Sequence, residues 1–195
     1  MRGLRTAAFG LIAAAAHPAL AANTSVYTTY NIDKCPKLDV DNTDQGDSGS
    51  WLCKGYAGLK IYFAEGDLRS LLAFGKTPQK HCATHQTFNG FNSVDAKVEW
   101  RLDKGKAIAT IQRWKVSYDS GDSSKMKSWL VVTKLQADDS CNMAIVEGAY
   151  PNANAKAREL ADQMSPTFTC KKGEEKILAL QKTLISEVAS SGCEH

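Results

Sequence analysis

The chain has 195 residues, of which 24 are basic and 21 acidic, so its formal net charge at pH 7 is only +3. So small an imbalance gives no electrostatic reason to expect nucleic acid or an anionic membrane surface as a partner. With 43% hydrophobic residues, the chain has the composition and length of a globular protein with a core.

The first 21 residues have the layout of a secretory signal peptide. Arg2 and Arg5 form a positive region, residues 7–16 are apolar but too few to span a bilayer, and Ala19–Ala21 form a small-x-small cleavage site. We expect cleavage after position 21, which leaves a single domain at 22–195 in the periplasm or outside the cell. No later stretch is apolar enough to cross a membrane, so no span is expected after cleavage.

All six cysteines follow the expected cleavage site, and an even number in an exported chain is typical of disulfides. Six cysteines allow 15 pairings, and the sequence does not choose among them. Proximity in the chain favours two bridges between neighbours and leaves one long bridge: Cys35 with Cys53, Cys141 with Cys170, and Cys82 with Cys193.

Residues 39–51 (DVDNTDQGDSGSW) suggest a calcium loop at first sight. An EF-hand needs glycine at its sixth position and a bidentate glutamate at its twelfth, where this stretch has Asp44 and Ser50. The favoured interpretation is a solvated loop closed by Cys35 and Cys53. A looser calcium site remains an alternative, and its ligands would be Asp39, Asp41, Asp44 and Asp47.

Three segments in the first half of the chain have candidate secondary structure. Residues 26–32 and 59–64 are predicted strands, the latter because Leu59, Ile61 and Phe63 alternate with other side chains. Residues 67–75 fit either a helical turn or a strand.

His81 and His85 flank Cys82 within five residues, a spacing that suggests zinc or copper. A structural zinc site usually needs four ligands, and the sequence offers no second cluster. We therefore expect Cys82 to form a disulfide and predict no metal and no cofactor. A hydrolase using either histidine is an alternative, although no Gly-x-Ser-x-Gly motif accompanies them.

The middle of the chain predicts four strands joined by short turns, an antiparallel meander. Val98, Trp100 and Leu102 alternate with charged residues in the first strand. Residues 107–118 place Ile108, Trp114, Val116 and Tyr118 on one side of the second. The others are residues 129–135, which carry Trp129, and 143–149. Trp100, Trp114 and Trp129 are expected in the core.

The C-terminal third changes to helical spacing. An apolar stripe from Ala153 to Met164 predicts a helix that Asn152 or Asn154 caps and Pro166 ends. A second helix is predicted over 174–189. The expected fold class is therefore α+β, an antiparallel meander with two C-terminal helices packed on it, stabilised by disulfides.

Two blocks, Trp51–Tyr56 and Tyr62–Arg69, together with Cys141 and the run Pro151–Ala155 leading to Cys170, resemble a group of small exported proteobacterial proteins. The resemblance implies a periplasmic or secreted bacterial protein. It carries no activity, because no function is established for that group.

The leading hypothesis is an exported protein that binds an envelope protein, an extracellular protein or a small ligand, as an accessory or inhibitor-like factor, and not an enzyme. The candidate binding surface combines Trp51 and the aspartates of the 39–51 loop with Tyr56 and Arg69. The alternatives are a secreted hydrolase using His81 or His85 and a calcium or transition-metal module.

Overall fold

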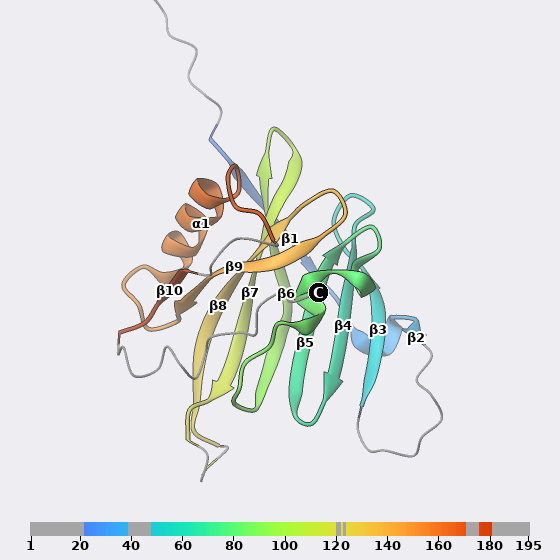
Figure 1. Cartoon of the computed structure of the whole chain (residues 1–195), viewed down its shortest axis with the longest axis vertical. Coiled ribbons are helices and arrows are strands. Elements are labelled where there is room, and N and C mark those ends of the chain that lie inside the picture. The colour runs from blue at the N-terminus through green and yellow to red at the C-terminus, as the bar shows by residue number, and fades with distance from the viewer. Residues whose placement is uncertain (1–21, 39–47, 120–121, 123, 171–175, 181–195) are drawn as a thin grey trace, which may run out of the picture.

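In a computed structural model, the part of the chain that the structure describes forms two β-sheets and one α-helix (Figure 1). The structure describes residues 22–38, 48–119, 122, 124–170 and 176–180. Within this part of the chain, no helix combines the length and the hydrophobicity that a membrane crossing requires.

Sheet A has six strands in the order β1-β6-β7-β8-β9-β10. Their bounds are β1 (Thr24–Thr29), β6 (Asn92–Asp103), β7 (Lys106–Ser117), β8 (Met126–Leu135), β9 (Ser140–Glu147) and β10 (Lys176–Leu178). β6 to β9 pair in sequence as an antiparallel meander, as predicted. β1 pairs antiparallel with β6, and β10 pairs parallel with β9. The β6–β7 register shifts between Val94 and Val98, which places a bulge at residues 95–97.

Sheet B has four antiparallel strands in sequence order. They are β2 (Lys37–Leu38), β3 (Gly49–Lys54), β4 (Lys60–Gly66) and β5 (Arg69–Gly75). The described residues also form three short 3₁₀ helices, which are η1 (Ile32–Lys34), η2 (Pro78–Lys80) and η3 (Cys82–His85). The ambiguous segment 67–75 is therefore mostly a strand.

The two sheets share one apolar core. Its centre holds three tryptophans of sheet A, Trp100, Trp114 and Trp129, all buried as predicted. Sheet B contributes Phe74, whose ring meets that of Trp100 edge-on at a centroid distance of 5.7 Å. Edge-to-face contacts of this kind add to the burial of large rings.

The other face of sheet A carries the helix α1 (Ala153–Met164), which packs on β8 and β9 (Figure 1). Ala157, Leu160 and Ala161 form its buried stripe, as the sequence predicted. Asn152, one of the two predicted caps, occupies the N-cap position. It adopts a left-handed conformation, however, and its side chain makes no capping hydrogen bond. Asn154 instead accepts a hydrogen bond from Arg113.

The predicted fold class is wrong. The described chain is mostly β, with two sheets and one helix, α1, longer than two turns. The second predicted helix, 174–189, is contradicted where the structure describes it, because Lys176–Leu178 form β10. Positions 181–189 lie outside the described residues. In the sequence, Ile177 falls on the apolar stripe that predicted this helix. Its pairing with β9 is a long-range contact, which local spacing does not reveal.

Disulfides join Cys35 to Cys53 and Cys141 to Cys170, as chain proximity favoured, with Cα–Cα distances of 4.8 and 5.4 Å. The first ties η1 to β3, and the second ties the segment after α1 to β9. Cys82 is also disulfide-bonded. Its predicted partner, Cys193, lies outside the described residues.

Candidate functional site

One end of the molecule carries a pocket of about 470 Å³. We call it the end pocket, and its lining comes from three separate segments: Arg69 of β5, Asn89–Phe91 before β6, and Ser117–Asp119, which begins at the last residue of β7. Its size falls within the range of pockets that bind small molecules or single side chains of a partner.

Backbone hydrogen bonds hold the three segments together. Asn92 N donates to Leu68 O, and Ser117 N donates to Phe91 O. The buried Asn92 side chain also accepts from Ser70 N and donates to Gly90 O. The walls of the end pocket are therefore held by the ends of both sheets and are not a free loop.

Gly90 is required by a close approach of two backbones. A Cβ atom at this position would lie 2.3 Å from Ser117 O. Any side chain here would push the Asn89–Phe91 segment away from the end of β7 and would open the pocket.

Arg69 is held in place at the rim. Its Nε and Nη2 donate to Asn89 O at 3.1 and 2.8 Å, and Nη1 pairs with Asp67. The guanidinium also lies over the Phe91 ring, 5.2 Å from its centroid. Asp67 already balances the charge of Arg69. The planar guanidinium can therefore contact a neutral ligand as well as an acidic one.

The structure does not bring the predicted site residues together. Arg69 lines the end pocket, but Tyr56 lies in the turn between β3 and β4, at the opposite end of β4. The seven residues of β4 separate them by roughly 20 Å at the usual rise per residue. The Tyr56 ring packs 6.2 Å from that of Trp100 and bridges the two sheets.

Trp51 is half-buried and packs on the shared core, with its ring centroid 5.7 Å from that of Phe63. Lys37 Nζ lies over the same ring at 5.7 Å. The contacts of Trp51 are therefore those of a residue that stabilises sheet B. The loop aspartates Asp39, Asp41, Asp44 and Asp47 lie outside the described residues.

His81 is buried, and its Nδ1 lies 3.1 Å from Ser140 Oγ. Ser140 is also fully buried, and its Oγ accepts a hydrogen bond from Phe74 N. The imidazole fits against Gly75, where a Cβ atom would lie 2.5 Å from its Cε1. Burial lowers the pKa of His81. This pair has the atoms of a nucleophile and a base, but its burial denies a substrate access to both.

His85 lies exposed at the end of η3. Across the described residues, no group of three or more histidine, cysteine, aspartate or glutamate side chains is arranged to hold a metal ion.

Sequence reasoning missed Phe91 and Tyr118. Tyr118 was placed on the apolar side of a strand, but β7 ends one residue earlier and the side chain is exposed. Phe91 lies in the run Asn89-Gly90-Phe91-Asn92. An aromatic residue among turn-forming residues, outside any alternating strand, is the signal that could have found it.

Comparison of the chain with protein-family models, with curated proteins and with solved structures finds no match.

Proposed function

We propose that the protein is an exported binding protein, an accessory or inhibitor-like factor, and that it engages another protein through the end pocket and the apolar side chains around it. Export is supported by the signal-like residues 1–21, by the disulfides, and by the resemblance to small exported proteobacterial proteins.

The observation that carries the binding proposal is an apolar rim around the end pocket. The rim consists of four exposed side chains: Leu68 (62% exposed), Phe91 (37%), Tyr118 (40%) and Met126 (41%). Met126 pairs with Ser117 across β7 and β8, and Phe91 adjoins Leu68 through the Asn92 hydrogen bond. Large apolar side chains gathered on one surface are typical of interaction sites.

The composition of this surface favours a protein as the partner. Aromatic residues, methionine and arginine are enriched in protein–protein interfaces, and the end pocket combines all three with its rim. An apolar side chain of the partner would enter the pocket between Phe91 and Tyr118.

The local charges are already balanced within the chain. Arg69 pairs with Asp67, and Lys125 pairs with Asp119 at 2.7 Å. The interaction should therefore depend little on ionic strength, because charge attraction contributes little to it.

The test is capture of a partner from the envelope and culture supernatant of the source organism by purified protein. Phe91→Ser with Tyr118→Ser should weaken retention at least tenfold, as expected for central aromatic anchors. Leu180→Ser is the matched control, because Leu180 is a 55% exposed apolar residue outside the rim.

A partner held equally by the double variant, or lost equally with the control, would refute the use of this surface. Retention of no partner by the unaltered protein would refute the binding function. Export has its own test, since the mature protein should begin at Ala22 by intact mass.

A further inference from the structure

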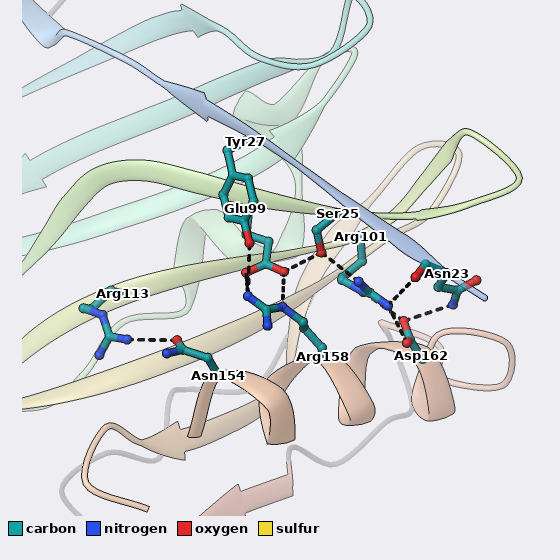
Figure 2. Close-up of polar contacts among 9 residues, drawn as sticks. All are labelled: Asn23, Ser25, Tyr27, Glu99, Arg101, Arg113, Asn154, Arg158 and Asp162. Atoms are coloured by element: carbon teal, nitrogen blue, oxygen red, sulfur yellow. Dashed lines mark hydrogen bonds and ion pairs between the residues drawn. The ribbon is translucent and has the colours of Figure 1, made fainter. Parts of the chain in front are cut away.

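Two partly buried ion pairs connect α1 to β6, next to β1 (Figure 2). Arg101 donates to both carboxylate oxygens of Asp162, at 3.0 and 2.6 Å. Arg158 donates to both oxygens of Glu99, at 2.5 and 3.1 Å. Ser25 Oγ links the pairs, since it accepts from Arg101 and donates to Glu99. Both arginines are thus neutralised by bidentate carboxylates.

A third arginine, Arg113, lies on the same surface but differs in its partners. Its Nη1 donates to Ser128 Oγ at 2.7 Å and its Nη2 to Asn154 Oδ1 at 3.0 Å. Both acceptors are neutral. Of the carboxylates in the described residues, none lies within ion-pair distance of Arg113. Its guanidinium is therefore oriented by neutral partners, of which Figure 2 shows Asn154, and no carboxylate of the described residues balances its charge.

A second cation, Lys97, lies nearby and is oriented by an aromatic ring. Lys97 Nζ lies over the ring of Tyr27, 4.6 Å from its centroid. Tyr27 Oη in turn accepts a hydrogen bond from Arg158 Nη2 at 3.0 Å. Lys97 is thus placed by an aromatic face and, like Arg113, has no ion-pair partner among the described carboxylates.

Arg113 and Lys97 both border a pocket of about 270 Å³ on the outer face of sheet A. We call it the face pocket. Its lining has three basic side chains and two acidic ones, and it rests on two buried apolar residues: Tyr27, Asp95, Lys97, Glu99, Ile111, Arg113, Leu130, Asn154 and Arg158. Glu99 and Arg158 pair with each other. Arg113 and Lys97 therefore face Asp95, a carboxylate that likewise has no ion-pair partner among the described residues. The apolar floor of Ile111 and Leu130 lowers the local dielectric and strengthens the attraction of an anion to those cations.

The first turn of α1 adds to the positive electrostatic potential of the face pocket. Asn154 is the second residue of the helix, so Arg113 lies at the positive end of the helix dipole. That turn contains no acidic residue, and the Asn152 side chain makes no capping bond.

We propose that the face pocket binds a small anion through Arg113 and Lys97, and that the bound group is a phosphate or a carboxylate. The planar guanidinium suits two parallel hydrogen bonds to either group. Lys97 supplies a point charge, and Ile111 and Leu130 contact the remainder of a small organic anion. This site lies on the sheet face, away from the end pocket, and does not depend on the function proposed above.

The competing interpretation is that Arg113 only helps to fasten α1 through Asn154. The two interpretations differ in the role of Asp95. If the pocket attracts anions, its free carboxylate opposes binding, and Asp95→Asn should tighten it. If Arg113 has only a structural role, Asp95→Asn should produce no gain in anion affinity.

The experiment follows the Asn154 side-chain amide and the Arg113 Nε–H by NMR during separate titrations with inorganic phosphate and with acetate, at constant ionic strength. Saturable shifts are expected with at least one probe, and the stronger response identifies the preferred group. Arg113→Gln should weaken binding about tenfold, the loss of a charged hydrogen-bonding partner. Lys97→Gln should weaken it about threefold, and Asp95→Asn should strengthen it about threefold.

Lys60→Gln is the control, because Lys60 is an exposed lysine on β4 of the other sheet, and it should leave binding unchanged. Since Arg113→Gln removes a contact to α1, Lys97→Gln provides the second variant with those contacts intact. Absence of saturable shifts with both probes, or equal losses in Lys60→Gln and Lys97→Gln, would overturn the proposal. Unchanged or weaker binding in Asp95→Asn would also overturn it.

Discussion

The two faces of sheet A are buried by different means, and β6 contributes to both. Val98, Trp100 and Leu102 point into the core shared with sheet B, where apolar side chains interlock. On the opposite face, Glu99 and Arg101 are nearly as deeply buried, at 8% and 6% exposure, beneath the charged side of α1. Alternation along a strand therefore reveals which residues share a face, but not whether the polar face meets water.

Because the two faces are buried by different means, substitutions on them should destabilise the protein for different reasons. An apolar face loses stability in proportion to the volume removed, because cavities form. A face held by paired charges depends on both partners, because removal of one leaves the other desolvated and unpaired. The following measurements test that contrast.

The largest effect is expected on the core face. Trp100→Ala removes a fully buried indole that also donates a hydrogen bond to Thr28 Oγ1. The free energy of unfolding should fall by about 3–5 kcal/mol, measured by guanidinium denaturation. Trp100→Phe keeps most of the volume and should cost clearly less. Equal losses in the two variants would contradict an account based on cavity volume.

A smaller loss is expected when one partner is removed on the charged face. Glu99→Ala should cost about 2 kcal/mol, below the roughly 3–5 kcal/mol of a fully buried pair, because the Arg158 side chain is 37% exposed. The double variant Glu99→Met with Arg158→Met should lose less free energy of unfolding than the sum of the losses in the single variants Glu99→Met and Arg158→Met. Lys156→Gln breaks an exposed ion pair on the same helix and should change stability by less than about 0.5 kcal/mol. Additive losses in the double variant would show that the charges are not coupled.

Two buried titratable groups, His81 and Glu99, should respond to acid in different pH ranges. Burial lowers the pKa of His81 from 6.5, so the folded state favours the neutral imidazole. Stability is therefore complete above pH 6.5 and falls below it, as the unfolded chain takes up the proton first. The loss grows until the pH reaches the lowered pKa of the folded state, where both states carry the proton.

Burial alone would raise the pKa of Glu99, but hydrogen bonds from Arg158 and Ser25 outweigh it and hold the pKa below 4.5. Its contribution is present above pH 4.5 and is lost as the pH falls through that lowered value. Unfolding measured from pH 7.5 to 5.5 separates the two groups. His81→Asn should flatten the dependence in this range, whereas Glu99→Gln should not. An unchanged slope in His81→Asn would rule out His81 as the source.

The smallest effect on stability is expected at the apolar rim. Phe91→Ser should lower the free energy of unfolding by less than about 1 kcal/mol, since the ring is 37% exposed and lies outside both cores. Thermal unfolding measures it. A loss as large as that of Trp100→Ala would make Phe91 a structural residue and would weaken the proposed binding role.

Local patterns in the sequence predicted the elements but not their assembly. The alternation around Trp100 and Trp114 predicted the β6–β9 meander, and the Ala157–Leu160 stripe with Pro166 beyond it predicted α1. The partner of residues 176–178, by contrast, is β9, about thirty positions earlier, and no local pattern indicates it. Sheet B was missed as a separate sheet for the same reason.

The candidate sites follow the same rule. Arg69 was predicted to belong to a site because of its own neighbours in the sequence. The end pocket, however, needs Phe91 and Tyr118, which only the fold brings to Arg69. The charge left free on Arg113 is equally invisible in the sequence, because it depends on which carboxylates the other two arginines have taken.

The pairing of β1 with β6 has a consequence for the time course of folding. Ser25 and Glu99 touch although they lie 74 positions apart in the chain, and all of sheet B lies between them. As a polypeptide emerges amino end first, β1 remains without its neighbour until the whole of sheet B and the η3 region have followed. Sheet B, with its own Cys35–Cys53 bridge, contains only contacts between nearby segments, which form sooner than distant ones. The first strand of the described residues, β1, is thus among the last to pair with its neighbour.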